Sequence, residues 1–576
     1  MKDFLKIWNL LEKKNKIYFF ILVILIFILA ILEVLSIAIV IPFVTLLLDP
    51  EALNNFKFFN IIKPFINFDN TQNLIIYTSV IFFVLFLTKN IFIAIVYRFL
   101  FNYVYEFRRG LTLKILKKYL YQDYLFFINT SYSKIASNIS NEVGNLSTNY
   151  LRPFLIIFSD LLILLFIIIL VVFSGYIKGA IIVIPFIILS AVFLKLIGKK
   201  VKYWGNIRVV NARNLTNIIY EIVLGIREIF LFGKIKKILK QFDFLQKQSS
   251  RLESNYQWVQ TLPKFALELS AILIFLFTLV YLTFQNINNK EIIVILTFYF
   301  AVAYRILPSF NKILIHFQQL KLGKPSLNII LKDLNLKGKI LYTDDINSGQ
   351  IDFENQIEFK NINFKYENRD ILFQNQSLLI LKNQATGIYG ESGSGKTTIL
   401  NIISCLIKPY NFELSVDGKS IQSKEDFRNY QNLISFVSQD SFFFQDTIKN
   451  NIAPYDDKNK IDNKKLLEAV EFSRLKNFLS ELPEGMDTII GVNSKEVSSG
   501  QKQRIALARM YYNLREIIIF DEATNALDEE NEVAIIENIL NLKDKKTIII
   551  VSHNKNNLKN CDKIIEVKNN KLILHK

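Results

Sequence analysis

The sequence GESGSGKT runs from Gly390 to Thr397, after the apolar segment Ala385–Tyr389 and before the helix-like segment TTILNIISCLI. It fits the phosphate-binding loop G-x-x-x-x-G-K-[ST]. Glycines allow the backbone to curl, so that successive N–H groups and the helix N-terminus point at phosphate oxygens. Because the chain has only 19 glycines among 576 residues, few such matches arise by chance. The order strand, loop and helix therefore predicts an α/β domain that binds a nucleoside triphosphate.

Two acidic residues follow a second apolar run downstream. Ile517–Phe520 comes immediately before Asp521 and Glu522. A buried strand that ends in two carboxylates can place one beside a magnesium ion and the other beside an attacking water, as hydrolysis of a phosphoanhydride requires. An Asp-Glu pair alone is common at the end of a core strand. Together with the phosphate-binding loop, it predicts an ATP hydrolase that uses Mg²⁺.

The composition indicates a membrane protein with at least two domains. Hydrophobic residues make up 51% of the chain, Phe occurs 50 times and the mean hydropathy is +0.28, which excludes a disordered or polar soluble protein. A chain of 576 residues also exceeds one ordinary domain core. Since a helix needs about 20 apolar residues to cross a bilayer, we expect six spans. They are Ile17–Leu48, Leu74–Tyr97, Phe154–Phe173, Ala180–Leu194, Phe265–Phe284 and Ile292–Ile315.

The connections between the spans alternate in length and charge. Arg98–Arg152 includes a basic cluster from Arg108 to Lys118 without an acid, and Lys195–Lys264 is also rich in Lys and Arg. The positive-inside rule then places both long loops, the N-terminus and everything after His316 in the cytoplasm. Contact with anionic lipid accounts for the net charge of +18 better than nucleic-acid binding does. We therefore expect a multi-pass protein with both termini cytoplasmic and no nucleic-acid partner.

The two ends of the membrane region define the expected domains. The first span far exceeds the roughly 7 to 15 residues of a signal-peptide core, and no small-residue cleavage site follows it. We expect it to remain as a helix that bends at Pro42. After the last span the chain becomes mixed and polar, which is typical of a linker. The prediction is a transmembrane domain over 1–330, a linker over 331–354 and a nucleotide-binding domain over 355–576.

Five motifs in a fixed order carry a family resemblance. They are GESGSGKT, Gln439 in ISFVSQD, VSSGQKQRIALARM, IIIFDEATNALD and His553 in IIIVSH. Together they resemble the nucleotide-binding domain of ABC transporters. YLYQDYLFFINTSYSKIASNISNEVGNLS and EIVLGIREIFLFGK resemble the two intracellular loops of ABC exporters. The resemblance implies an exporter-type half-transporter: a membrane all-α domain of six helices plus a cytoplasmic α/β P-loop ABC ATPase domain.

The resemblance also implies which residues bind the nucleotide. Tyr366 in FKY would stack on adenine, Asp528 in NALD matches a segment that contacts a second copy, and VSSGQ matches the family signature. The cofactors would be ATP and Mg²⁺. The residues expected to bind the nucleotide are Tyr366, Gly390, Glu391, Ser392, Gly393, Ser394, Gly395, Lys396, Thr397, Thr398, Ser498, Gly500, Gln501 and Asp528.

Five positions match the catalytic and metal-binding residues of the family. Thr397, Gln439 and Asp521 would hold Mg²⁺. Glu522 would be the base that polarises the attacking water. His553 would contact the γ-phosphate, and Gln439 would belong to the catalytic set as well as to the metal site. A lone histidine is usually structural, but this one follows an apolar strand after the acidic motif.

The family pairs the signature of one subunit with the phosphate-binding loop of another, which implies a dimer. Two departures bear on it: Ser499 replaces the commonest glycine of the signature, and Val492 stands where exporters usually carry Glu. Serine adds a Cβ and restricts the backbone, so we expect a competent but slower ATPase. A heterodimer with one weakened site is the alternative. Intact Glu522 and His553 favour a homodimer.

Charged residues inside the spans mark a candidate substrate site. Lys89, Lys264 and Arg305 stand among otherwise apolar residues, as do the acids Glu33 and Glu268. A charge in a hydrocarbon span costs roughly 2.5 to 3.5 kcal/mol on insertion scales, so such residues usually face a cavity or a partner. One reading is snorkelling or ion pairing within the membrane, for example of a lysine with Glu33. The other is a cationic cavity for an anionic head group such as a pyrophosphate.

A closer resemblance favours the second reading. LEVLSIAIVIPFVTLLLDP and YRILPSFNKILI resemble bacterial flippases of lipid-linked oligosaccharides, the PglK-like group, in which cavity arginines are thought to engage the lipid-linked pyrophosphate. Arg305 falls in the matching motif, while Lys89 and Lys264 keep the charge but lose bidentate geometry. The resemblance implies an ATP-driven translocase of a polyprenyl-pyrophosphate oligosaccharide in a bacterial inner membrane, with membrane lipid as a further partner.

Other readings stay open at this point. Export of a peptide, a drug or a phospholipid would use the same fold. An alternative of another class is a nucleotide-gated membrane regulator without transport. The presence of both Glu522 and His553 is evidence against it.

The segment after the first span has apolar residues at the spacing of a short helix that lies on the membrane surface: Leu53, Phe56, Phe59 and Ile62. The sequence equally supports the alternative that this loop packs against the membrane spans.

Overall fold

The computed structural model divides into two compact units. Met1–Leu120 and Thr130–Lys337 form the helical unit, and Tyr121–Asn129 and Gly338–Lys576 form the sheet unit. The domain boundaries inferred from the sequence, at 330 and 355, stay predictions. The structure describes residues 13–48, 71–173, 183–285, 289–338, 351–367, 369–454, 460–491, 497–522, 529–553 and 555–575.

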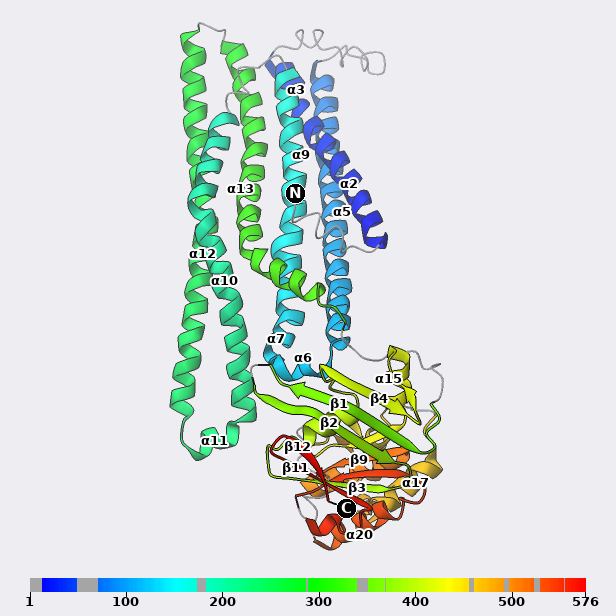
Figure 1. Cartoon of the computed structure of the whole chain (residues 1–576). Helices are drawn as coiled ribbons and strands as arrows, with labels where there is room; N and C mark the ends of the chain where they lie inside the picture. Colours follow the sequence, from blue (N-terminus) through cyan, green and yellow to red (C-terminus); the bar gives the residue numbers. More distant parts are fainter. Residues whose placement is uncertain are drawn as a thin grey trace. The chain divides into compact units, whose positions relative to one another are not determined.

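The described part of the helical unit consists mainly of long helices (Figure 1). One continuous helical stretch includes two π-helical segments, η3 and η4. The elements are α2 (Lys13–Ala38), α3 (Val40–Leu48), α5 (Thr71–Leu120), α7 (Tyr132–Ser137), η3 (Asn138–Glu142), α8 (Val143–Leu146), η4 (Ser147–Leu151), α9 (Arg152–Phe173), α10 (Val183–Leu224), α11 (Ile226–Leu231), α12 (Ile235–Phe284) and α13 (Asn289–Leu334).

The first span breaks close to where its proline predicts. The helix is interrupted at Ile39, between α2 and α3. Pro42 has no N–H to donate to Ala38, and its ring crowds that carbonyl. Helical hydrogen bonding resumes at Phe43, whose N–H donates to the Ile39 carbonyl at 3.2 Å. The expected surface helix around Leu53 lies outside the described residues.

Among the described residues, five helical stretches are long and apolar enough to cross a membrane: Lys13–Leu47, Ile75–Leu120, Tyr132–Phe173, Ile235–Phe284 and Ile292–Leu334. They cover five of the six expected spans, apart from the terminal residues Leu48 and Leu74. The remaining run, Ala180–Leu194, is described from Val183 onward, where it begins α10. Several helices exceed the span itself: α12 has 50 residues, or about 75 Å at 1.5 Å per residue.

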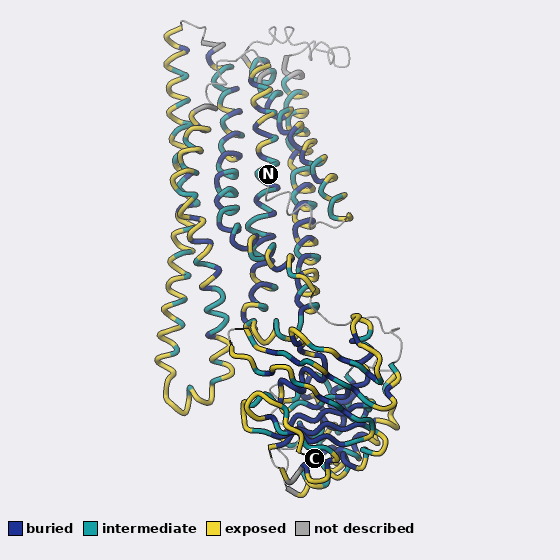
Figure 2. Tube along the Cα trace, viewed as in Figure 1, coloured by how far each residue is buried: buried dark blue, intermediate teal, exposed yellow. Residues whose placement is uncertain are grey.

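The core of the helical unit lies between α9 and α13. Buried residues of both helices pack together, with Ile163 and Ile167 against Phe298 and Val302. By contrast, α12 is mostly exposed, and α11 has no buried residue (Figure 2). Figure 2 shows the exposure of α11 and α12, whereas α10 also carries buried residues such as Val201 and Trp204.

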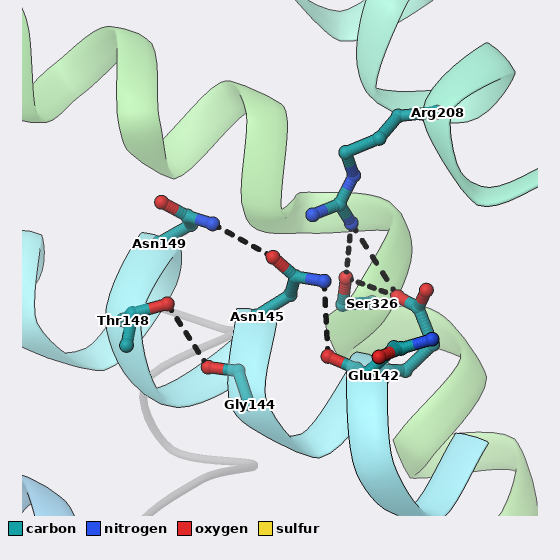
Figure 3. Close-up of polar contacts among 8 residues, drawn as sticks. Glu142, Gly144, Asn145, Thr148, Asn149, Arg208 and Ser326 are labelled. Carbon is teal, nitrogen blue, oxygen red and sulfur yellow. Dashed lines mark hydrogen bonds and ion pairs between the residues drawn. The ribbon is translucent and has the colours of Figure 1, made fainter. Parts of the chain in front are cut away.

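A buried polar network ties three helical segments together (Figure 3). From α10, Arg208 places its Nη2 atom 2.8 Å from Ser326 Oγ on α13 and 3.4 Å from Glu142 Oε2 on η3. The Ser326 hydroxyl also donates to Glu142 Oε2 at 2.5 Å. The Glu142 side chain is 1% exposed. Nearby, a Cβ on Gly205 or Gly323 would lie under 3 Å from backbone atoms, so the helices touch closely there.

Replacing Arg208 by Ala is expected to destabilise the helical unit by about 3 kcal/mol or more, because the Glu142 carboxylate would stay buried without its cation. Thermal unfolding of the purified full chain in one detergent and one lipid would measure this. Arg109→Ala is the matched control: Arg109 pairs with Glu106 at 2.9 Å, but both side chains are more than 60% exposed. The control should cost less than about 1 kcal/mol; equal losses would contradict the prediction.

The sheet unit contains three sheets and short helices. Its six-stranded sheet has the order β12-β11-β3-β10-β9-β6, its four-stranded antiparallel sheet the order β2-β1-β4-β5, and β7 pairs with β8. The strands are β1 (Gln356–Lys365), β2 (Ile371–Leu381), β3 (Ala385–Tyr389), β4 (Asn411–Val416), β5 (Lys419–Ser420), β6 (Ile434–Val437), β7 (Asp446–Thr447), β8 (Ile489–Ile490), β9 (Ile517–Asp521), β10 (Thr547–Val551), β11 (Lys563–Lys568) and β12 (Lys571–Leu574). The helices are α6 (Tyr124–Asn129), α14 (Lys396–Ile403), α15 (Lys424–Gln431), α16 (Ile448–Ile452), α17 (Asn463–Phe472), α18 (Lys476–Glu481), η6 (Gly485–Asp487), α19 (Ser499–Tyr512), α20 (Glu529–Leu540) and η7 (Lys555–Leu558).

Both faces of the central strands β3, β9 and β10 of the six-stranded sheet are buried. Along β10, Ile548 and Ile550 enter one hydrophobic cluster, while Ile549 and Val551 enter the other. This alternation is that of a strand whose side chains point to opposite faces, and it explains why such strands read as continuous apolar runs. The buried strands β3, β9 and β10 are parallel to one another. Their carboxyl ends therefore lie at one edge of the sheet.

A tight turn fixes the start of β1, the strand that leads to Tyr366. Asp417 joins β4 to β5 and has a positive φ of 48°. Its carboxylate accepts hydrogen bonds from the backbone N–H groups of Glu354, Asn355 and Gln356 at 2.6 to 2.8 Å. Partial burial acts to raise the pKa of Asp417, but these three hydrogen bonds outweigh it and lower that pKa.

Candidate functional site

The phosphate-binding loop connects β3 to α14 in a tightly packed backbone. A Cβ on Gly390 would lie 2.5 Å from the Val567 carbonyl oxygen, so no larger residue fits there. Gly395 caps α14 with φ of 107°, a conformation that L side chains rarely adopt. Within the loop, Ser394 Oγ is buried and has no hydrogen-bond partner among the described residues. The loop thus combines a turn that only glycine permits with an unsatisfied polar atom.

Lys396 lies at the first position of α14 and points back along the loop. Its Nζ donates to the carbonyls of Gly390 at 2.9 Å and Glu391 at 3.0 Å. Burial lowers the pKa of Lys396, and this effect outweighs the opposing influence of Glu522 and Asp521. A cation held out of water interacts more strongly with a phosphate than an exposed one does.

The acidic motif lies at the adjacent strand end. Asp521 is the last residue of β9, opposite Val551 of β10, and accepts a hydrogen bond from Thr397. Burial is the main cause that raises the pKa of Asp521, and the neighbouring Glu522 charge acts in the same direction. The phosphate-binding loop and the acidic motif are therefore in contact through Thr397 of the loop and Asp521 of the motif.

Glu522 has an unusual backbone conformation. Its φ is 50°, in the left-handed region, and its N–H donates to the Val551 carbonyl at 3.2 Å. For a residue other than glycine this conformation costs roughly 1 to 3 kcal/mol. The Glu522 side chain is 7% exposed, and its Oε1 lies 2.6 Å from His553 Nε2, which follows β10. The strain therefore coincides with contact between two of the expected catalytic residues.

The oxygen atoms at this edge suit magnesium. Mg²⁺ prefers hard oxygen ligands and usually takes one or two from protein and the others from water and phosphate. Thr397 and Asp521 supply a hydroxyl and a carboxylate in contact with one another. In the described part of the chain, no group of three or more His, Cys, Asp and Glu residues could hold a metal alone. These two oxygen donors thus fit a metal ion whose remaining ligands come from a bound phosphate and water.

Tyr366 lies beside the helix that follows the phosphate-binding loop. Its Oη is 3.0 Å from Thr398 Oγ1, within hydrogen-bond distance. The ring of Phe364 meets it edge-on at 4.9 Å, and the Arg369 guanidinium lies 5.9 Å from its centroid. Thr398 and Tyr366 are thus brought together as expected for one binding region. Arg369 was missed because no motif marks it.

The other expected nucleotide residues are placed separately. Gln439 is exposed and lies two residues beyond β6, the strand next to β9. Ser498 caps α19, and its hydrogen bonds are with Gln501: the Gln501 N–H donates to Ser498 Oγ at 3.2 Å, and the Ser498 N–H donates to Gln501 Oε1 at 2.7 Å. Gly500 lies in the first turn of the same helix. Asp528 and Val492 are outside the described residues.

The charged residues of the spans form one cluster and one separate pair. Lys89 Nζ on α5 lies 3.5 Å from Glu33 Oε2 on α2, the ion pair that the sequence suggested. Arg305 Nη2 on α13 lies 2.7 Å from Glu33 Oε1. Lys264 does not join them: it pairs with Glu268 on its own helix at 3.8 Å and is 60% exposed. Within the described helical unit, the structure therefore unites two of the three expected cations.

A cavity of about 280 Å³ adjoins this cluster. Lys89, Arg305 and Glu33 line it, together with aromatic residues that include Phe86 and Tyr304. Lys89 Nζ also lies 4.4 Å from the Phe86 ring centroid, a cation–π distance. Sequence reasoning could name the charged residues, because they interrupt apolar runs, but it could not place them around one cavity.

Family comparison covers most of the chain. The ABC transporter transmembrane region matches residues 17–305, half of the chain, and the ABC transporter ATPase family matches residues 373–525. The chain belongs to the ABC transporter family. This ABC transporter has one membrane region and one ATPase domain, the arrangement of an exporter half-transporter, and its expected fold class is confirmed.

Individual relatives support the same family. An uncharacterized ABC transporter ATP-binding protein of Sinorhizobium fredii is 39% identical over 178 residues. An ATP-dependent lipid A-core flippase of Haemophilus influenzae is 38% identical over 181 residues. Each match spans 31% of this ABC transporter and 30% of the relative.

A solved structure supports the fold over a longer range. The structure of a bacterial Atm1-family ABC exporter with ATP bound is similar with a TM-score of 0.77. The match covers 94% of this ABC transporter and 93% of that chain, at 18% sequence identity. At that identity the likeness is one of fold.

Proposed function

We propose that this ABC transporter hydrolyses ATP and uses it to move a polyprenyl-pyrophosphate oligosaccharide from the inner to the outer leaflet of a bacterial inner membrane. The working unit is a homodimer with both termini of each chain in the cytoplasm. ATP binding would clamp two ATPase domains together and hydrolysis would release them, so that nucleotide affinity biases the membrane helices between two states.

The geometry around Asp521 supports the ATPase half of this proposal. Lys396 and Thr397 would hold phosphate and magnesium beside Asp521, and Mg²⁺ would supply charge stabilisation of the phosphoryl group. Glu522 lies in contact with His553, where a base could polarise water and an imidazole could contact the γ-phosphate. The exposed signature segment at Ser498 would complete the site of a second copy, which supports a dimer. A heterodimer is the alternative.

The single observation that carries the substrate proposal is the shared contact of Lys89 and Arg305 beside one cavity. Both cations line the cavity, where they could contact an anionic head group. The relatives include ATP-dependent lipid A-core flippases, whose name also gives a lipid as what they move. Export of a peptide, drug or phospholipid is the alternative on the same fold. A nucleotide-gated regulator without transport would not require this cavity.

Arg305→Ala tests the substrate proposal. In proteoliposomes, the increase of ATP turnover caused by a polyprenyl-pyrophosphate oligosaccharide is expected to fall about tenfold or more, because a charge-assisted bidentate contact is lost. Basal turnover should stay close to wild type. The control is Arg98→Ala, which removes an exposed arginine of the same α5 helix that carries Lys89. Unchanged stimulation in the Arg305 variant would favour the peptide or drug alternative.

A further inference from the structure

Glu33 is the most deeply buried carboxylate of the membrane cluster. Its side chain is 1% exposed, whereas those of Lys89 and Arg305 are 11% and 19% exposed. The carboxylate lies on α2 between a lysine from α5 and an arginine from α13. It therefore forms ion pairs with two other helices that are distant in sequence.

The polar groups of this cluster are incompletely satisfied. Glu33 Oε2 and Arg305 Nε are buried and have no hydrogen-bond partner among the described residues. A second buried carboxylate, Asp160 on α9, also interacts with Arg305, and Lys312 interacts with Asp160 in turn. A phosphate group would supply the acceptor that Arg305 Nε lacks. The adjoining cavity of about 280 Å³ is lined by all three charged residues, so it provides the space for such a group.

We propose that Glu33 is a built-in counter-ion that the anionic head group of the substrate displaces from Arg305 and Lys89. The inference rests on the proposed function and names Glu33 as a residue that sets affinity and release. Without Glu33, both cations would lose this counter-ion in a hydrocarbon region, at a cost of several kcal/mol. A pyrophosphate carries more than one negative charge and more acceptor oxygens than a carboxylate, and so it competes for both cations.

If the substrate displaces Glu33 from the two cations, Glu33 can also pair with them again. When the head group leaves, the Glu33 carboxylate again pairs with both cations, which favours release over rebinding. Glu33→Gln is therefore expected to bind the substrate more tightly and to release it more slowly. In transport assays, both KM and the maximal rate should fall. A purely structural role for Glu33 would lower the maximal rate without lowering KM.

Binding of farnesyl pyrophosphate to the full chain in detergent, without nucleotide, tests the inference directly. Glu33→Gln is expected to bind this probe about tenfold more tightly than wild type, because one competing charge is gone. Farnesol, which lacks the anionic group, should bind both proteins equally. Glu268→Gln is the matched control, since Glu268 also pairs with a lysine in a membrane helix but is 53% exposed, and its ion pair is with Lys264 of its own helix. Its affinity for the probe should equal that of wild type.

A second variant provides a test that does not depend on the correct folding of Glu33→Gln. Glu33→Gln combined with Lys89→Gln keeps the net charge of the cluster and removes the carboxylate that pairs with Arg305. It should bind the probe more tightly than Lys89→Gln alone, because Glu33 no longer competes for Arg305. Equal or weaker binding in both comparisons, in protein that is monodisperse on size exclusion, would overturn the inference. If wild type binds the probe and Glu33→Gln tightens it, yet no lipid-linked oligosaccharide is transported, the proposed function fails and the inference stands.

Discussion

Replacing Glu522 by Gln is expected to lower ATP turnover by about a hundredfold or more while ATP still binds. A positioned general base contributes roughly 10² to 10⁴ to rate, and glutamine has nearly the same shape but cannot accept the proton. Because Glu522 is 7% exposed and contacts His553 at 2.6 Å, the amide should occupy the same place. Phosphate release and nucleotide binding, measured separately on the purified full chain, distinguish the two effects.

Glu516→Gln is the control for this variant. Glu516 immediately precedes β9, at the end of the strand opposite to Asp521, and pairs with Lys546 at 2.6 Å with 41% of its side chain exposed. Its replacement should leave turnover within about twofold of wild type. If the Glu522 variant hydrolysed ATP as fast as wild type, the proposed base would be wrong, and with it the active role of the Glu522–His553 contact.

Lys396→Met is expected to weaken ATP binding about a hundredfold and to abolish measurable turnover. The lysine is buried at the start of α14, so its charge acts on a bound phosphate with little screening by water. Loss of one or two charge-assisted hydrogen bonds, at 1.5 to 3 kcal/mol each, corresponds to that factor. Binding of a fluorescent ATP analogue and ATPase activity measure the two consequences.

Lys408→Met provides the matched comparison. Lys408 is exposed and lies 5.5 Å from the Phe427 ring in the same unit. Because it is outside the phosphate-binding loop, its replacement should change nucleotide affinity by less than about twofold. Similar losses in both variants would show that general surface charge, and not Lys396 itself, governs binding.

The local elements of both units were predictable for physical reasons. An apolar run long enough to cross a bilayer has few other stable states, so five of the expected spans appear as long helices. A glycine-rich loop between an apolar strand and a helix likewise predicts its own geometry, and positive φ angles occur at Gly393 and Gly395. Pro42 predicted a bend, although the interruption falls at Ile39.

Contacts between distant segments were less accessible from the sequence. Glu142 lies in a recognised loop segment, but nothing in that segment indicates that it pairs with Arg208 and Ser326. The left-handed conformation of Glu522 also has no local signal, because φ is imposed there by packing at the strand end. Lys264 and Lys89 looked equivalent as isolated charges in apolar runs, yet only Lys89 reaches Glu33.

The sequence by itself determined the family, the order of helices and strands, and the residue types available to bind phosphate and magnesium, because these depend on short-range pattern and spacing. The tertiary structure decided which of those residues meet. Parallel pairing of β3, β9 and β10 brings together residues that are far apart in the sequence, such as Ile388 and Val551, which are 163 positions apart (551 − 388). Helix packing decided that Glu33 lies between Lys89 and Arg305, since the partners of a buried charge depend on three-dimensional proximity.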